Sequence, residues 1–322
     1  MMKKIGLFLL ALGSLLIFQS CGDPYGPPAE TLHGRMLCAA NVSYDISPTG
    51  TFAKEAPMYG GAAFTEEPRI YMGGPDNIHA ALLGRTQDGL LLAFRGTLGP
   101  SEVTSPAVRD WLNNLIGAAP VAVPGIKGRV QEGFWKALEV LWEPILNDLK
   151  AMQKPNEALR VTGHSKGGAI ASLFAARLLE EGIPVAEVVV FGSPKVFDEQ
   201  AAKAYEDQIK QFSYECNTDL VPFVAPANTF ITLCAEVPLI GELFAPARDW
   251  NYSGFGEIRL ISQDGKVSGD NFLGSLKRGG EFISFLSKGS EGLEKIVGAH
   301  AAGCGGTYFR VLCPDLDCPK GK

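Results

Sequence analysis

The chain has 322 residues, of which 46% are hydrophobic and 20% are charged, and its formal net charge is −6 at neutral pH. A chain of this length and composition can bury a full α/β core as one domain. The acidic balance argues against a nucleic-acid partner, because phosphate backbones are bound through an excess of lysine and arginine.

The first twenty residues predict an export signal. Residues 1–20 open with Lys3 and Lys4, continue through two apolar runs and end at Ser20, just before Cys21. This arrangement is typical of a signal peptide, and a short spanning helix is the alternative. Removing the segment deletes two lysines and no acid, so the net charge becomes about −8.

Residues 17–21, IFQSC, resemble a bacterial lipobox. The resemblance implies that Cys21 is acylated and anchors an exported protein to the bacterial cell envelope. Two positions depart from the usual lipobox residues, so ordinary signal-peptidase cleavage, with a secreted or periplasmic product, is the alternative. Residues 21–30 then combine the lipidated cysteine with a short tether rich in Pro and Gly, and residues 31–322 are expected to form a single domain.

Cysteine parity favours the lipoprotein interpretation. If lipid occupies Cys21, an even number of cysteines remains to pair in an oxidising compartment. They are Cys38, Cys216, Cys234, Cys304, Cys313 and Cys318. The options local in sequence are Cys216 with Cys234, and Cys313 with either Cys304 or Cys318. Unpaired thiols in a reducing cell are the alternative.

The segment 78–97 predicts a strand hairpin that leads into a loop. Two apolar runs, residues 78–85 and 89–94, are separated by three turn residues. The second run ends at a loop that begins with residues 95–97. Further along, residues 133–152 carry apolar side chains at helical spacing, which indicates a helix laid on a sheet.

Strand and helix patterns alternate through the following segments. They are a strand before Ser165, an alanine-rich helix after it, a continuous apolar strand at 186–191, a helix at about 198–209, a strand at 211–216, and a hairpin at 252–267 that turns at Gly265. This alternation predicts an α/β fold with a mostly parallel central sheet flanked by helices. Open sheets of this kind place their functional residues at the strand ends.

Ser165 is a candidate nucleophile because it lies between Gly163 and Gly167, at the point where a strand must turn sharply into a helix. Such a turn strains the backbone, raises the hydroxyl above the sheet and directs the backbone N–H of Lys166 toward the reacting centre. The glycines are expected where a Cβ would collide with the neighbouring strand and helix. A glycine-rich turn with an incidental serine is the alternative.

A serine nucleophile needs a base, and the chain has four histidines. His164 adjoins Ser165 and is expected to point away from its hydroxyl, whereas His33 and His79 lie well before it. His300 remains, in a glycine-containing segment that indicates a loop.

The base in turn needs an acid to orient it. Asp219 is favoured because it follows the strand at 211–216, at the sheet edge where the other candidates lie. Asp198, Asp207 and Asp249 compete for this role. Asp198 and Asp207 are more simply explained as a helix cap and a solvated helix face.

Several segments together resemble the fungal-type lipases, lipase class 3, a branch of the α/β hydrolases. In chain order they are LLLAFRGT (90–97), VRDWLNNL (108–115), GRVQEGFWKAL (128–138), VTGHSKGGAIASL (161–173), VVVFGSPKVFD (188–198) and NTDLVPFVAP (217–226). The resemblance spans roughly residues 88–310 and implies an α/β-hydrolase fold.

The same resemblance implies a site. Ser165, Asp219 and His300 would form the catalytic triad, and Thr97 and the backbone N–H of Lys166 would form the oxyanion hole. Lys166 stands where the family usually carries Leu. Its side chain is either solvated or a cation beside the site that favours anionic substrates.

These expectations describe a carboxylic-ester hydrolase of the lipase or esterase type. It would act on a lipid or another acyl ester through an acyl-enzyme, and this chemistry requires no metal or organic cofactor. Its partners would be the ester substrate and, through Cys21, a membrane; the oligomeric state is open. Two alternatives use the same fold: a non-catalytic lipid-binding envelope lipoprotein, and an acyltransferase that passes the acyl group to an alcohol.

Overall fold

The structure is a computed structural model that describes residues 25–98, 119–219, 221–223, 250–269 and 298–319. The predicted signal peptide, the predicted lipidation site Cys21, Cys234 and the competing acid Asp249 lie outside these residues.

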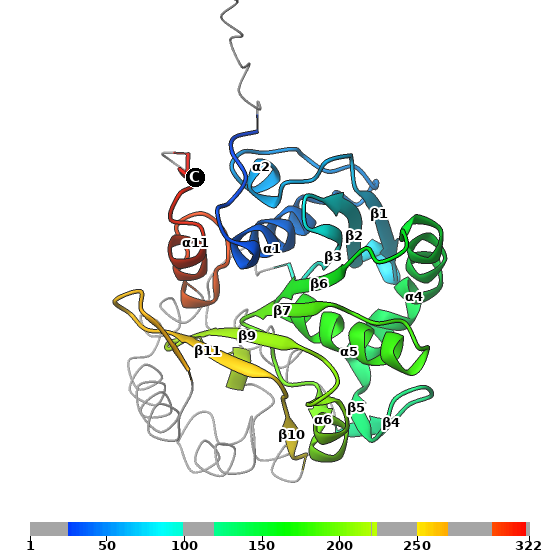
Figure 1. The fold of residues 1–322 in the computed structure, drawn as a ribbon. Helices are drawn as coiled ribbons and strands as arrows, with labels where there is room; N and C mark the ends of the chain where they lie inside the picture. The colour runs from blue at the N-terminus through cyan, green and yellow to red at the C-terminus, as the bar shows by residue number, and fades with distance from the viewer. Residues whose placement is uncertain (1–24, 99–118, 220, 224–249, 270–297, 320–322) are drawn as a thin grey trace, which may run out of the picture.

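An eight-stranded sheet forms the centre of the molecule (Figure 1). In spatial order its strands are β1 (Arg69–Gly73), β2 (His79–Thr86), β3 (Gly89–Phe94), β6 (Leu159–His164), β7 (Glu187–Phe191), β9 (Gln211–Cys216), β11 (Glu257–Ile261) and β12 (Val267–Gly269). The strands from β3 to β11 run parallel, and antiparallel pairs close both edges. The prediction of a mostly parallel sheet is confirmed.

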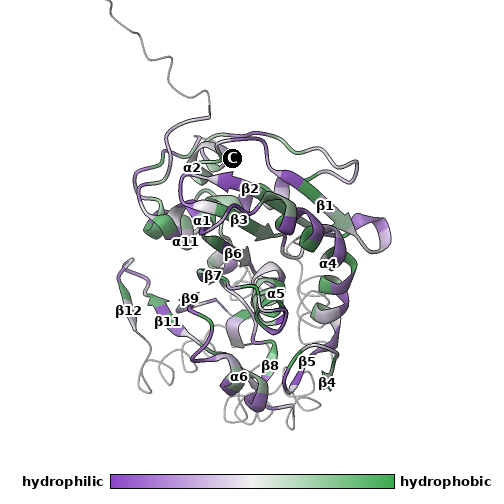
Figure 2. Cartoon of the chain, turned by 45° about the vertical axis from the view of Figure 1, so that its right-hand side comes forward, coloured by the Kyte–Doolittle hydropathy of each residue, from purple (hydrophilic) through white to green (hydrophobic). Residues whose placement is uncertain are grey.

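Helices cover both faces of this sheet (Figures 1 and 2). On one face lie α4 (Glu132–Met152), α5 (Lys166–Glu180) and α6 (Glu199–Tyr205); on the other lie α1 (Leu32–Val42), α2 (Met58–Ala62) and α11 (Thr307–Leu312). Successive residues of a strand point to opposite faces, so Val188 and Val190 pack in the first core and Val189 in the second. This double burial explains the continuous apolar run that the sequence shows there.

A smaller antiparallel sheet lies beside α6. It orders β10 (Tyr252–Ser253), β8 (Phe197–Asp198), β5 (Arg129–Gln131) and β4 (Pro120–Ala122), and the 3-10 helices are η1 (Ser43–Asp45), η2 (Pro75–Asn77) and η3 (Val221–Phe223). The hairpin predicted at 252–267 is therefore shorter than expected. Tyr252 pairs with Asp198 in the small sheet, and only β11 and β12 form the hairpin. Its turn at Gly265 has the expected positive φ, 81°.

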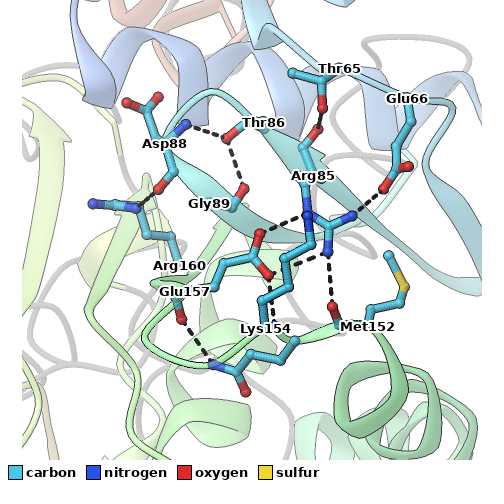
Figure 3. A network of polar contacts seen from close by, with 11 residues as sticks. Thr65, Glu66, Arg85, Thr86, Asp88, Gly89, Met152, Lys154, Glu157 and Arg160 are labelled. Carbon is cyan, nitrogen blue, oxygen red and sulfur yellow. Dashed lines mark hydrogen bonds and ion pairs between the residues drawn. The ribbon is translucent and has the colours of Figure 1, made fainter.

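Ion pairs and hydrogen bonds join neighbouring strands and loops at the end of the sheet opposite Ser165 (Figure 3). Arg85, near the end of β2, forms an ion pair with Glu157, in the loop before β6, with 2.7 Å between Nε and Oε1. Its guanidinium also donates to the Met152 carbonyl at the end of α4. Arg160 on β6 donates to the backbone carbonyl of Asp88, in the turn between β2 and β3. These contacts hold the hairpin against the strand that carries the serine.

The segment expected to be a tether packs on the domain from residue 25 onward. The Tyr25 ring contacts the Tyr59 ring, with their centroids 5.0 Å apart. Ala29 is buried, and its N–H donates to the Gly61 carbonyl. Residues 25–30 are thus part of the folded unit, because they cover apolar side chains of α2.

The cysteine pairing differs from the options local in sequence. Cys304 forms a disulfide with Cys318, so the expected pairing of Cys313 with either of them is wrong. Cys313 follows α11 and faces the core, where its sulfur lies 3.7 Å from that of Cys38 on α1. Cys38, Cys216 and Cys313 are buried thiols.

Candidate active site

Ser165 lies at a strained turn between β6 and α5. Its φ of 57° and ψ of −132° fall outside the regions that ordinary side chains adopt. A Cβ on Gly163 would strike the backbone of α5, and a Cβ on Gly167 would strike the Phe94 carbonyl at the end of β3. The expected reason for the two glycines is thus confirmed, and the turn places Ser165 at the carboxyl edge of the parallel strands.

The Ser165 side chain lies beside the start of a helix. The residue is 1% exposed, and within the described part of the chain its Oγ has no hydrogen-bond partner. Because α5 begins at Lys166, the N–H groups of its first turn have no acceptor within the helix and form the positive end of its dipole. Thr97 follows β3, which is the parallel neighbour of β6, and it is half-buried.

A carboxylate and an imidazole meet at the same edge of the sheet. The Nδ1 atom of His300 lies 2.9 Å from each carboxylate oxygen of Asp219, which is completely buried. The Val221 N–H donates to Oδ1, and the Tyr308 hydroxyl donates to Oδ2 at 2.7 Å and accepts from the Cys216 N–H. These donors hold the carboxylate in place and direct Nδ1 of the imidazole toward it. Nε2 is therefore the nitrogen left for proton exchange with a hydroxyl.

His300 lies in a helical stretch, residues 298–300, rather than in the loop that its glycines indicate. A Cβ on Gly192, at the end of β7, would lie 2.6 Å from Asp219 Oδ2 and 3.0 Å from His300 Nδ1. Since β7 is the neighbour of β6, the pair of side chains lies one strand away from Ser165.

His164 supports His300 instead of competing with it. Its ring packs against the His300 ring at a centroid distance of 4.4 Å, and its Nε2–H donates to the His300 carbonyl at 2.7 Å. The Tyr44 hydroxyl then donates to Nδ1 at 2.8 Å. Burial holds the pKa of His164 well below its usual range, so the ring stays neutral. Because His164 directly precedes Ser165, these contacts hold His300 close to the strand-to-helix turn.

The remaining histidine and acid candidates have other partners. His33 contacts Tyr214 and Glu187, and Glu187 lies at the opposite end of β7 from the site. Asp198 caps α6 by accepting from the Ala201 N–H, as predicted. Asp207 is exposed, and it lies just beyond the end of α6.

The Lys166 side chain is buried, so its interpretation as a solvated lysine is wrong. The residue is 8% exposed, and its Nζ lies 3.3 Å from Nδ1 of His79. Burial and the nearby Arg95 guanidinium lower the pKa of Lys166 to about 8. Burial, Lys166 and Arg95 lower the pKa of His79 to about 4. Three basic side chains therefore gather on the side of Ser165 where β2 begins and β3 ends.

Among the described residues, no cluster of three or more His, Cys, Asp or Glu side chains could hold a metal ion. Within the same residues, no helix combines the length and apolar character that a membrane crossing requires. Tyr44 and Tyr308, which bind His164 and Asp219, were not among the residues expected from the sequence. No motif marks them, because each reaches the site from a distant part of the chain.

Known proteins resemble this chain over its middle part. Residues 91–229 match the family model described as lipase (class 3). The secreted mono- and diacylglycerol lipase A of Penicillium cyclopium is 32% identical over 141 residues, which cover 42% of this chain and 43% of the relative. A lipase of Rhizomucor miehei is 31% identical over 154 residues, covering 45% and 39%. The chain thus spans less than half the length of these curated relatives, and its matched part is related to the class 3 lipases.

Solved structures are similar over more of the chain. A crystal structure of a mutant of MDLA from Penicillium cyclopium covers 74% of this chain and 84% of its own, with a TM-score of 0.54 and 22% identity. A crystal structure described as a fungal lipase covers 73% and 80%, with a TM-score of 0.51 and 21% identity. This likeness, together with the mostly parallel sheet flanked by helices, establishes the α/β-hydrolase fold predicted from the sequence.

Proposed function

We propose that this protein is a serine carboxylic-ester hydrolase of the lipase or esterase type, in which Ser165, His300 and Asp219 act as the triad. The observation that carries the proposal is the buried contact between Asp219 and His300, one strand away from a serine at a strained strand-to-helix turn. The match of residues 91–229 to the class 3 lipases supports it independently.

The reaction follows from the proposed roles. Ser165 Oγ attacks the ester carbonyl while its proton moves to Nε2 of His300, and Asp219 stabilises the imidazolium that forms. The bond to the alcohol breaks, His300 returns the proton to the departing oxygen, and an acyl-enzyme remains. Water then repeats the sequence, releasing the carboxylic acid and restoring the serine. The serine and the base are not hydrogen-bonded to each other here, and such bonds often tighten only when substrate is bound.

The charge that develops on the carbonyl oxygen needs fixed donors. The backbone N–H of Lys166, at the positive end of α5, and Thr97, at the end of β3, are proposed as this oxyanion hole. One such donor contributes about 3 kcal/mol to transition-state stabilisation.

The test is hydrolysis of p-nitrophenyl esters, from acetate to palmitate, by the full-length protein and by Ser165→Ala. We expect activity in the parent and a loss of several orders of magnitude in the variant. Equal activity in both would refute the role of Ser165. A folded parent that is inactive on every ester would favour the lipid-binding alternative. Free acid as the sole product in the presence of an added alcohol would exclude the acyltransferase.

We also propose that the protein is exported and is anchored through an acylated Cys21. The lipobox-like segment 17–21 supports both export and anchoring, whereas the Penicillium relative, which is named as a secreted lipase, supports export alone. Mass spectrometry of the mature N-terminus tests it. A diacylglyceryl group on Cys21 is expected, whereas a mature chain with an unmodified Cys21, or one cut elsewhere, would contradict anchoring.

A further inference from the structure

Lys166 is a buried cation, and the nearby Arg95 adds a second positive charge. Its ammonium can donate three hydrogen bonds, yet the one partner recorded for it within the described residues is Nδ1 of His79. Arg95 donates to the backbone carbonyls of Ile46, Asn77 and Ile78 and has no carboxylate partner in that part of the chain. Because a buried ammonium is unfavourable without a counter-charge, and the described residues supply none for Lys166, an anionic ligand would stabilise it.

The ammonium lies on the oxyanion-hole side of the serine. Helix α5 starts at Lys166, so the same residue presents its backbone N–H at Ser165 and its side chain toward β2. His79 begins β2, the antiparallel neighbour of β3, and the Arg95 N–H donates to the Ala80 carbonyl. This register sets His79 opposite Gly96, one residue before Thr97. Lys166 Nζ therefore lies next to the loop that would hold the reacting carbonyl.

Two exposed apolar residues are sequence neighbours of His79 and Thr97. Ile78, which precedes His79, is 46% exposed, and Leu98, which follows Thr97, is 54% exposed. Large apolar side chains at such exposure suit contact with a hydrocarbon chain. A buried ammonium in the same region as exposed apolar side chains suits a molecule that carries both an anionic group and an acyl chain.

We propose that Lys166, supported by His79, binds an anionic group carried by the ester substrate, so that the enzyme prefers acyl esters bearing a carboxylate or phosphate near the scissile bond. This inference rests on the proposed hydrolysis by Ser165. The anionic group belongs either to the acyl part or to the alcohol part of the ester, and the two are distinguished by experiment.

The experiment compares matched esters with the full-length protein. For the acyl side, mono-p-nitrophenyl glutarate is compared with p-nitrophenyl pentanoate, which has the same chain length without the carboxylate. For the alcohol side, dihexanoyl phosphatidylglycerol is compared with dihexanoylglycerol. The readout is the ratio of kcat/KM for the anionic ester to that for the neutral ester, which cancels any common effect on the oxyanion hole.

We expect Lys166→Met to lower this ratio about ten- to a hundredfold in at least one pair, with Lys166→Arg retaining most of it. His79→Asn should lower it less. Lys136→Met, which removes an exposed lysine from α4, is the matched control and should leave the ratio unchanged. If Lys166→Met folds poorly, His79→Asn still tests whether the ratio falls, with Lys166→Arg as the variant that keeps the charge.

Each outcome bears on the inference in one direction. A fall in the glutarate pair assigns the anionic group to the acyl part, and a fall in the phospholipid pair assigns it to the alcohol part. Equal losses on charged and neutral esters would overturn the inference, because Lys166 would then act only through its position in the turn. Loss of all hydrolysis in Ser165→Ala, with an unchanged ratio in Lys166→Met, would overturn this inference while upholding the proposed function.

Discussion

Replacing Tyr308 with phenylalanine tests whether the buried carboxylate is held for catalysis. The Tyr308 hydroxyl donates to Asp219 Oδ2 at 2.7 Å and accepts from the Cys216 N–H at 3.1 Å. A hydrogen bond to a buried charge contributes about 1.5–3 kcal/mol, and the orphaned N–H costs about 1–3 kcal/mol more. Part of this loss is recovered by relaxation, so we expect a destabilisation of about 2–4 kcal/mol. Thermal or urea unfolding measures it.

Activity should fall beyond what stability explains. Asp219 keeps His300 and the Val221 N–H in Tyr308→Phe, but it loses the donor on its other oxygen, and the imidazole becomes less firmly oriented. We expect kcat/KM for a neutral p-nitrophenyl ester to drop about tenfold, which corresponds to about 1.4 kcal/mol of transition-state stabilisation.

A matched control separates positioning from folding. Tyr205 is equally buried, and its hydroxyl accepts from the Lys127 N–H at 2.8 Å, beside α6 and away from Ser165. Tyr205→Phe should be destabilised to a similar extent and keep the kcat/KM of the parent at temperatures where it is folded. If Tyr308→Phe keeps the same kcat/KM as Tyr205→Phe under those conditions, the reasoning about Asp219 is refuted.

Three further predictions concern charge and covalent structure. Asp219→Asn should lower kcat about 10⁴-fold without unfolding the protein, because the amide favours the wrong imidazole tautomer; a loss below about tenfold in stopped-time ester assays would argue against Asp219 as the orienting acid. The preference for anionic esters should weaken as pH rises from about 7 to 9, since the Lys166 pKa of about 8 means that the ammonium is charged below this value and neutral above it. Over this pH range the described neighbours of Lys166 do not titrate: Arg95, on the β3 side, stays charged, and His79 on β2, with a pKa of about 4, stays neutral. A ratio of kcat/KM for anionic and neutral esters that does not change with pH would therefore count against Lys166. Cys304→Ser with Cys318→Ser should lower the unfolding free energy by about 3 kcal/mol, as the loop of 14 residues regains freedom in the unfolded chain, and an unchanged urea midpoint would contradict this.

The sequence predicts those helices and strands that are long enough for burial to give their apolar residues a recognisable period. The strand at 211–216 and the helix around 133–152 are found at nearly the expected bounds, because packing imposes an alternating apolar pattern on the strand and a helical one on the helix. Strands β4, β8 and β10 are two or three residues long, too short for any period to be recognised. Their pairing depends on contacts between segments far apart in the chain.

The pairing of the cysteines also depends on contacts that distance in the sequence does not predict. Proximity in sequence favours Cys313 with Cys304 or Cys318, but Cys313 directly follows the short helix α11 and faces the core, toward Cys38. A disulfide requires Cβ atoms that face each other a few ångströms apart, and the number of intervening residues does not determine that geometry.

At the site, the sequence predicts the residues that the proposed reaction needs, but not the residues that position them. A serine nucleophile needs a base, and His300 is favoured because the other three of the four histidines are less well placed in the sequence. Tyr44, His164 and Tyr308 come from three separate segments and become neighbours only when α1 and α11 pack on the same face of the sheet. The burial of Lys166 is equally invisible, since a lysine after a candidate nucleophile is expected to be solvated. It becomes informative only once His79 and Arg95 are known to lie beside it, because a buried cation beside a second cation favours an anionic ligand where the described residues supply no counter-charge.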